Sequence, residues 1–559
     1  MEMLILLLPL LPLFSAALNH VSYKQAGHKA AKTSVAFGVI NFILAVALLA
    51  MVMGGDKTSQ VALFDSWGIL IADPLSVLMA LLISGISLIV RIYSIKYMIE
   101  EAGYGRFFML LDLMTATLLL MVTAGDLISL LVAWHLVGVL LYFLLGFDSR
   151  SHTAYRYAFW TLITYRVGDI ALVLAAGLLF HAYGTWSLSE IFAAVTENPG
   201  AHQYFGFVLE ELVGFLLAIA AFARSAQFFL HTWLPYTMDG PTPVSALMHA
   251  GIVNAGGFLI NRFSPIFIQT ESTLHLLFIV GLVTAIIGSV LMLTQNDIKK
   301  ALGYSTMGQM GFMIMECGLG AFSLAIYHLI AHGLFKGTLF LGAGTVINKA
   351  RKHDGVPQDD LYTFVVERQS AQQRQPWLMM VGITLAVPII ILFLAHWLVA
   401  QNFFQNQGAI VLLFFGWITG AQLLFTTYRM HTQNIWRLIG IIILSFTVIV
   451  LGYAFISHAF DLFLYPDAAF REQIYAAAGI DIFWFNVLVL LTTAIIVASW
   501  VLIYYSEQNH MSEQKKITQW WIRFYALISR EFYIIDFYSW LTRTIFKAAT
   551  RLNVLLRWR

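Results

Sequence analysis

Three titratable side chains follow one another at helical spacing in the second half of the chain. His328, His332 and Lys336 are each four residues apart, so a helix would place them on one stripe. Imidazole and amine groups whose pKa values can be tuned toward 7 are suited to passing protons along such a stripe. A histidine pair at this spacing is also typical of zinc ligands, but Leu329 stands where an HExxH motif needs a glutamate. Hydrogen bonding between helices, without transport, is the simplest alternative.

Other charged residues also fall inside apolar segments. A charge at the centre of a membrane helix costs roughly 2.5–3.5 kcal/mol on insertion scales, so each is a candidate for function. We predict an ion pathway for protons or another monovalent cation, with no catalytic residue, metal or cofactor. Its candidate residues are His135, Arg166, Asp169, Arg224, His249, Lys299, Lys300, His328, His332, Lys336 and His396.

The composition requires a membrane as the solvent of these residues. Of 559 residues, 60% are hydrophobic and 11% are charged, whereas a soluble domain has roughly 25% charged residues. Apolar blocks such as Leu75–Ile95 and Leu274–Leu293 have the length of about 20 residues that crosses a bilayer. A net charge of +2 without a basic soluble domain argues against nucleic-acid binding. The single cysteine, Cys317, excludes a disulfide framework and an iron–sulfur cluster.

We therefore predict an all-α polytopic membrane protein with about 15 transmembrane helices. Basic residues gather in alternate loops, among them Arg91, Lys96 and Arg106 between the third and fourth spans. Because basic loops stay cytoplasmic, we expect a multi-pass protein of the cell inner (plasma) membrane, with its N-terminus outside and its C-terminus in the cytoplasm. We also expect an extracytoplasmic hairpin at 59–70. The predicted spans are 2–18, 33–53, 74–95, 106–123, 127–147, 155–180, 205–230, 243–264, 274–294, 298–318, 320–345, 377–400, 408–428, 436–458 and 481–505.

Two segments depart from this pattern of regular spans. Pro235, Gly240, Pro241 and Pro243 cannot lie in an uninterrupted helix, and broken backbone at membrane depth lines polar cavities; an ordinary loop is the alternative. The tail 506–559 interleaves basic and aromatic residues, which predicts amphipathic helices at the cytoplasmic interface. They would bind membrane lipid or dock a partner. The candidate partner-binding residues are Lys515, Trp520, Trp521, Arg530 and Trp540.

Several motifs together resemble the antiporter-like family shared by respiratory complex I and Mrp-type cation/proton antiporters, and most closely complex I chain L. They extend from about Arg106 to Ile347 and comprise Trp134–Gly138, Arg166–Asp169, Arg224–Gln227, Gly240–Ala250, Asp297–Gln309 and His332–Ile347. The resemblance implies two inverted five-helix repeats, each with a broken helix and a half-channel. The expected domains are 1–105 (N-terminal membrane helices), 106–266 (first repeat), 267–430 (second repeat), 431–505 (C-terminal membrane helices) and 506–559 (basic amphipathic tail).

The chain departs from the family at its charged positions. The glutamate of the pattern WEGVG is His135, the lysine of KSAQ is Arg224, and the motif GFFSKD is missing, which leaves His396 near its lysine position. In the family, that glutamate–lysine pair is thought to switch as protons pass. Arginine stays protonated in proteins, so Arg224 can be only a fixed charge. It could pair with Glu211, Asp169 or a partner.

A second departure lies after the last span. Complex I chain L continues into a long lateral helix and a sixteenth span, whereas this chain has only its basic tail. Short relatives of this plan include the DabB subunit of the DAB inorganic-carbon transporter, whose cytoplasmic partner, DabA, resembles a zinc carbonic anhydrase. The resemblance thus implies a transport subunit, not an enzyme, that couples cation flow to conversion of CO2 to bicarbonate by a DabA-like partner at the cytoplasmic face and tail. The alternatives are a proton-translocating subunit of a complex I-like, hydrogenase or Mrp assembly, and a non-conducting membrane anchor.

Overall fold

A computed structural model describes most of the chain up to residue 350, then residues 435–479 and 519–557, and the single residues 390 and 487. Short gaps lie at 22–28, 56–57, 65–66, 149, 238–239 and 296. The predicted spans 377–400, 408–428 and 481–505 lie outside the described residues, as do His396 and Lys515. Within the described part, nine helices are long and apolar enough to cross a membrane.

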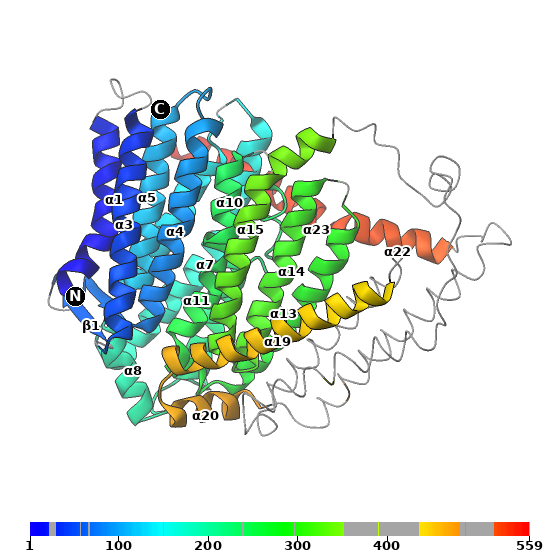
Figure 1. Ribbon diagram of the computed structural model, residues 1–559. Coiled ribbons are helices and arrows are strands. Elements are labelled where there is room, and N and C mark those ends of the chain that lie inside the picture. The colour runs from blue at the N-terminus through cyan, green and yellow to red at the C-terminus, as the bar shows by residue number, and fades with distance from the viewer. Residues whose placement is uncertain are drawn as a thin grey trace. The chain divides into compact units, whose positions relative to one another are not determined.

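The chain forms two units. The first holds Met1–Gly318, Ala325–Ala343 and Ile517–Arg559, and the second holds Leu319–Leu324 and Gly344–Lys516. All described candidate residues belong to the first unit. Figure 1 shows the N-terminal helices of this unit side by side, drawn in blue. In the second unit, α19 (Ile435–Leu464) contains the predicted span 436–458, and Asp467 caps α20 (Ala468–Ala477).

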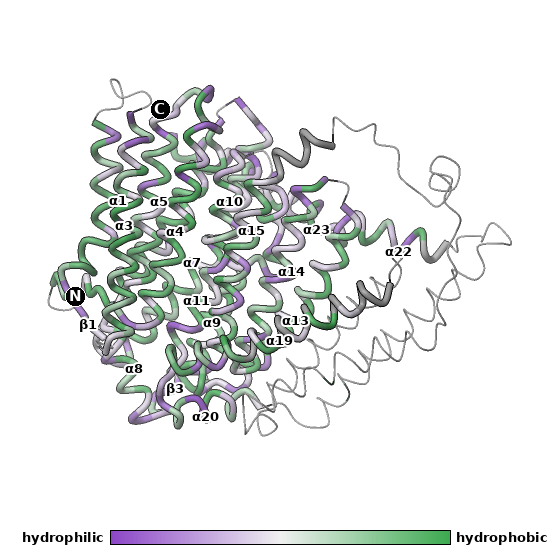
Figure 2. Tube along the Cα trace, in the orientation of Figure 1, coloured by the Kyte–Doolittle hydropathy of each residue, from purple (hydrophilic) through white to green (hydrophobic). Residues whose placement is uncertain are grey.

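The first unit begins with four packed helices, α1 (Glu2–Val21), α3 (Lys29–Met53), α4 (Pro74–Tyr97) and α5 (Tyr104–Thr123). They are hydrophobic over most of their length (Figure 2). The strands β1 (Ser59–Ala62) and β2 (Ile69–Ala72) pair antiparallel between α3 and α4, which confirms the predicted hairpin. Asp126 fixes this hairpin, since its carboxylate accepts hydrogen bonds from the backbone N–H groups of Ile69 (2.7 Å) and Ser129 (2.8 Å).

The next helices surround an interrupted segment. The elements are α6 (Leu127–Leu145), α7 (His152–Tyr183), α8 (Leu188–Glu197), β3 (Gln203–Tyr204), β4 (Phe207–Val208), α9 (Leu209–Arg224), α10 (Thr242–Ala250), the 3₁₀ turn η2 (Ile252–Asn254), α11 (Ala255–Arg262) and α12 (Ser264–Phe267). The predicted span 205–230 is wrong at both ends, because a hairpin precedes α9 and the helix stops at Arg224. There Ala226 and Phe229 adopt positive φ angles of 48° and 73°, which an α-helix cannot contain.

The break continues to the start of α10 and has its own hydrogen bonds. Ser225 Oγ donates to the carbonyl of Val253 (2.8 Å), and Trp233 Nε1 donates to that of Ala223 (3.1 Å). These bonds satisfy backbone groups that an uninterrupted helix would pair internally. The predicted interruption at Pro235–Pro243 is therefore present, but it begins earlier than predicted, directly after Arg224, and neighbouring segments fix its geometry.

Three further helices follow: α13 (Glu271–Leu293), α14 (Ile298–Gly318) and α15 (Phe322–Ala350), of which α14 and α15 carry candidate residues. Glycines let the backbones of α13 and α14 approach closely. A Cβ atom at Gly281 would lie 2.4 Å from the backbone nitrogen of Met315, and one at Gly311 would lie 2.4 Å from that of Ala285. Small residues at helix contacts are the usual means of close packing in membranes.

The tail also folds as helices and is part of the first unit. It consists of α22 (Gln519–Ser529), the short turn η5 (Glu531–Tyr533) and α23 (Ile534–Leu556). The inner face of α23 packs on the membrane helices through Ile534 and Tyr538, which are buried with Trp160. The predicted helical tail is present, and one side of it is covered by the chain itself.

Candidate functional site

The stripe of titratable residues lies on α15 and meets polar side chains of α14. Lys336 Nζ donates to Ser305 Oγ (2.8 Å) and to the carbonyl of Leu302 (3.4 Å). His328 contacts Gln309 Oε1 through Nε2 (2.9 Å). Lys336 is 1% exposed and His332 5% exposed. His328 is half-buried. The helix thus brings two buried titratable groups and one half-buried group into one row, as the spacing predicts.

Glu316 on α14 joins this row, although the sequence analysis does not include it. Its carboxylate lies 3.1 Å from His328 Nδ1. The sequence does contain a signal for Glu316, because it is the single acidic residue in the apolar run around Cys317. A carboxylate inside a membrane costs free energy, so it is usually paired or functional. We call Glu316, His328, His332 and Lys336 the α14–α15 row.

One histidine of the row and a second histidine beside it have ring nitrogens without hydrogen bonds in the described structure. These are both nitrogens of His332 and Nε2 of His249. His249 Nδ1 contacts Thr306 Oγ1 (3.1 Å), and its ring stacks on Phe340 at 4.1 Å. The rings of His328 and His332 are 6.3 Å apart. Ring nitrogens in this arrangement can accept a transferred proton or bind water.

Lys299 and Lys300, at the start of α14, point to other partners. Lys299 Nζ is 3.4 Å from Thr242 Oγ1. Lys300 Nζ is 2.9 Å from the carboxylate of Glu531 in the tail and 2.8 Å from the hydroxyl of Tyr236 in the break. Both predicted pathway lysines thus lie on the helix next to α15, and the amine of Lys300 is engaged by the tail.

Asp169 on α7 is the acidic centre of the first group of candidates. Its Oδ2 lies 3.1 Å from His135 Nδ1 and 2.9 Å from an Arg166 nitrogen, and its Oδ1 lies 3.4 Å from Arg224. Among the partners left open for Arg224, the structure selects Asp169. Glu211 instead accepts hydrogen bonds from Thr273 Oγ1 (3.2 Å) and the backbone N–H of Ser272 (3.3 Å).

Aromatic rings and a carbonyl complete the surroundings of Arg224. Its guanidinium carbon lies 4.0 Å from the ring centre of Tyr165 and 4.7 Å from that of Trp134, and it donates to the Trp134 carbonyl. The side chain is 1% exposed, whereas that of His135 is 52% exposed. Arg224 therefore places a buried positive charge beside Asp169, whereas the His135 side chain is exposed.

This geometry predicts that Arg224→Lys keeps most transport activity and that Arg224→Ala loses about tenfold. Lysine preserves the charge beside Asp169 but loses the planar stacking on the Tyr165 and Trp134 rings. This loss weakens the interaction by about 1–2 kcal/mol at a desolvated site. Alanine leaves Asp169 with Arg166 alone as its arginine partner. Ion flux into vesicles that contain equal amounts of each variant measures the difference. Full flux in Arg224→Ala would remove Arg224 from the mechanism.

Among the tail residues proposed to bind a partner, the two with described side chains are both exposed. Trp540 is 60% exposed, and Arg530 is exposed with its guanidinium 5.5 Å from the ring of Tyr533. Trp520 and Trp521 lie in α22, but the described structure does not extend to their side chains. On the covered side, Tyr538 donates to the carbonyl of Phe229 (2.8 Å).

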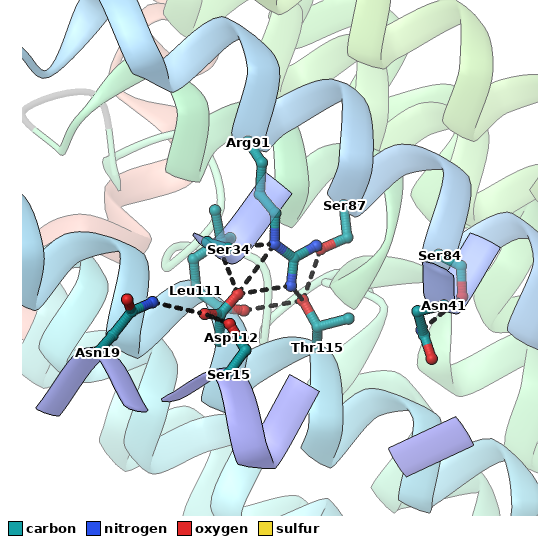
Figure 3. Close-up of polar contacts among 10 residues, drawn as sticks. All are labelled: Ser15, Asn19, Ser34, Asn41, Ser84, Ser87, Arg91, Leu111, Asp112 and Thr115. Carbon is teal, nitrogen blue, oxygen red and sulfur yellow. Dashed lines mark hydrogen bonds and ion pairs between the residues drawn. The ribbon is translucent and has the colours of Figure 1, made fainter. Parts of the chain in front are cut away.

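A buried ion pair outside the predicted site holds the N-terminal helices together (Figure 3). The Arg91 guanidinium is 2.9 Å from the Asp112 carboxylate, which also accepts hydrogen bonds from Ser15 (2.7 Å) and Asn19 (3.1 Å). Arg91 is 1% exposed and Asp112 0%. Counting Arg91 as a loop charge was therefore wrong: it is near the end of α4, but its side chain turns inward. Lys96 and Arg106 remain as basic residues of that loop.

A second ion pair joins the start of α4 to the end of α11. Arg262 lies 2.6 Å from the carboxylate of Asp73, which also accepts a hydrogen bond from the backbone N–H of Ser76 (2.8 Å). Burial raises the pKa of Asp73, but the charge of Arg262 and these hydrogen bonds lower it more, so the pKa lies below its ordinary value. The carboxylate thus stays charged and its contribution to stability is lost only in acid.

No group of three or more histidine, cysteine, aspartate or glutamate side chains in the described residues is arranged to hold a metal ion. His328 and His332 do share one helix face, but the nearest described acid, Glu316, contacts His328. The arrangement supports proton exchange between polar side chains.

Two family models match the chain. The model described as "NADH:quinone oxidoreductase/Mrp antiporter, TM" matches residues 124–422. The model described as "NADH-Ubiquinone oxidoreductase (complex I), chain 5 N-terminus" matches residues 65–108. Together they cover the strand β2, the helix break and the whole α14–α15 row.

Curated relatives differ in how much of their length the chain spans. The chain is 56% identical over 553 residues, 99% of each chain, to "Probable inorganic carbon transporter subunit DabB1" from Halothiobacillus neapolitanus. It is 37% identical over 318 residues to "NAD(P)H-quinone oxidoreductase subunit 5, chloroplastic" from Capsella bursa-pastoris. That match covers 57% of this chain and 41% of the chloroplast protein.

Solved structures share the fold. The Mrp complex from Dietzia sp. DQ12-45-1b matches with a TM-score of 0.59 at 22% identity, over 99% of this chain and 60% of that one. The archaeal membrane-bound sulfane sulfur reductase matches with a TM-score of 0.60 at 16% identity, over 84% and 99%. These similarities confirm the predicted all-α polytopic membrane fold.

Proposed function

Because this chain belongs to the NADH:quinone oxidoreductase/Mrp antiporter family of membrane subunits, as its motifs predict, we propose that it conducts protons, or another monovalent cation, along the α14–α15 row. It is a multi-pass transport subunit and not an enzyme. The observation that carries the proposal is the row itself: Glu316, His332 and Lys336 are buried, His328 is half-buried, and the four side chains follow one another along two adjacent helices.

The contacts of the row allow each group to change its protonation state. The Ser305 hydroxyl that accepts from the Lys336 ammonium can donate to the neutral amine. His328 lies between Glu316 and Gln309, so it can be stabilised as a cation by the carboxylate and as a neutral ring by the amide. A group that is satisfied in both states can accept a proton and release it. His332, between them in the sequence, would connect the two.

For the coupled process we propose inorganic-carbon accumulation. Support comes from the full-length similarity to a relative named as a probable inorganic carbon transporter subunit. A proton that crosses 100 mV releases about 2.3 kcal/mol, which shifts an equilibrium by a few tens of fold. A cytoplasmic DabA-type zinc partner that hydrates CO2 to bicarbonate could use this energy. The proposal places the chain in the cell inner membrane, with its N-terminus outside and its tail in the cytoplasm beside the partner.

A second candidate is a proton-translocating subunit of an electron-transfer complex. It is favoured by the 37% identity to a chloroplast quinone oxidoreductase subunit. Purification of the tagged chain in its native complex distinguishes the two candidate functions. We expect a zinc protein to co-purify, and cells that carry both proteins to accumulate bicarbonate until a protonophore collapses the membrane potential. Iron–sulfur or nickel subunits in place of the zinc protein would support the second candidate.

We propose that the exposed side of the tail binds the partner through Arg530 and Trp540, with Lys515, Trp520 and Trp521. Clusters of aromatic and arginine side chains are typical of protein interfaces. The double variant Arg530→Ala with Trp540→Ala is expected to reduce partner recovery at least tenfold. The matched control is Phe205→Ala, because Phe205 is 88% exposed but lies in the β3–β4 hairpin. Equal recovery from wild type and the tail variant would leave the tail as a membrane contact only.

A further inference from the structure

The tail inserts one carboxylate into the membrane unit. Glu531 lies at the bend between α22 and α23 and is 1% exposed. Its Oε1 is 2.9 Å from Lys300 Nζ and accepts a hydrogen bond from the Tyr236 hydroxyl (2.8 Å). Lys300 also lies over the Tyr236 ring, 4.3 Å from its centre. The three side chains come from the tail, the start of α14 and the break after α9.

The bend that presents this carboxylate has an unusual backbone. Glu531, Phe532 and Tyr533 have φ angles of 54°, 55° and 60°, a left-handed conformation that costs a side chain of this size free energy at each residue. Three such residues in a row persist only where surrounding contacts require them. Here the requirement is met by the ion pair with Lys300 and by the packing of Ile534 and Tyr538.

The helix that carries Lys300 also carries the partners of the row. Ser305, Gln309 and Glu316 follow Lys300 on α14 and contact Lys336 and His328. A shift or rotation of α14 at Lys300 therefore changes distances in the row, because a packed helix moves as a unit. The tail and the row are thus joined through α14, with the ion pair to Glu531 at one point and the contacts to Lys336 and His328 farther along the helix.

We propose that Glu531 is a positioning residue for ion conduction: by holding Lys300 and Tyr236, it sets α14 in the position in which the row conducts. This proposal rests on the proposed conduction through the row. The proposal also gives the tail a second role, because a partner bound to the exposed side of the tail acts on the bend that carries Glu531. Glu531 thereby couples the tail to the ion pathway without contacting the ion.

The test uses the full chain in its native complex, reconstituted into liposomes, with two measurements. One is proton flux under an imposed potential; the other is the rate at which trypsin cuts the tail at its exposed basic residues. In Glu531→Gln we expect flux to fall about tenfold and cleavage to become several times faster. The matched control is Asp536→Asn, because Asp536 is an exposed carboxylate of the same tail. It should match wild type in both measurements.

A coupling measurement distinguishes positioning from simple fastening. If Glu531 acts through Lys300, adding Glu531→Gln to Lys300→Met should cause no further loss of flux. Faster cleavage with unchanged flux would mean that Glu531 only fastens the tail and would overturn the proposal, as would independent losses in the double variant. If Glu531→Gln does not reach the membrane, Tyr236→Phe removes one hydrogen bond to the same carboxylate and should lower flux about threefold; unchanged flux would overturn the proposal.

The two measurements also separate this proposal from the proposed function. If the wild-type complex shows no flux, conduction itself fails, while the cleavage rate still reports whether Glu531 holds the tail. If wild type conducts and Lys336→Met does not, conduction stands, and the Glu531 variants alone decide the role of the tail.

Discussion

Lys336→Met is expected to lower proton flux at least ~100-fold in membrane vesicles, with the protein still inserted and its complex assembled. A positioned group that exchanges protons contributes roughly 10²–10⁴-fold to the rate of transfer, and methionine fills the same space without a proton to exchange. Lys336→Arg should fail as well, because arginine keeps the charge but cannot release its proton. A pH-sensitive dye in inverted vesicles gives the flux, and the amount of purified complex gives assembly.

The matched control for these variants is Lys96→Met. Lys96 is a second lysine of the same unit, and its side chain is exposed in the last turn of α4. We expect it to retain at least about half of the flux. An active Lys336→Arg would mean that a fixed positive charge is sufficient, and proton exchange through the row would have to be abandoned.

Asp112→Leu is expected to destabilise the protein by about 3–5 kcal/mol, the usual cost of removing one partner from a buried ion pair. The substitution leaves the Arg91 guanidinium among Ser34, Ser87 and Thr115 without its counter-charge (Figure 3). It also removes the acceptor that connects Ser15 and Asn19 of α1 to α5. Thermal unfolding in detergent and the yield of folded protein measure the loss.

The double variant Arg91→Met with Asp112→Leu is the control for the pair. Because replacing both charges with apolar groups leaves no unpaired charge, it should be much less destabilised than Asp112→Leu alone. Equal losses in the single and double variants would mean that the hydroxyl contacts, and not the ion pair, hold these four helices together.

Local sequence patterns predicted the features that depend on short spacing. The prolines after Arg224 mark a true helix break, the segment 59–70 forms a hairpin, and His328, His332 and Lys336 share one helix. Each of these follows from backbone geometry within a few turns of chain. The ends of the predicted span 205–230 were wrong for two reasons. A small hairpin that turns at Gly206 precedes α9, and the turns that end the helix, at Ala226 and Phe229, contain no glycine to signal them.

Pairing between distant residues was not predictable in the same way. Tyr236 and Glu531 are 295 positions apart, and nothing in their local sequence indicates that they meet. Arg91 looked like a loop charge because its hydrophobic stretch ends nearby, but Asp112 lies opposite it on the neighbouring helix. For Arg224, sequence reasoning could only name possible acids; the packing of α7 against α9 selects Asp169.

The most direct test of conduction through the α14–α15 row is proton uptake by liposomes that contain the purified complex, driven by a potassium diffusion potential. Wild type is compared with His332→Ala and with the control His181→Ala, whose histidine contacts Tyr204 outside the row. Conduction through the row predicts rapid uptake in wild type and His181→Ala, and at least ~100-fold slower uptake in His332→Ala. Equal uptake in all three proteins would contradict it.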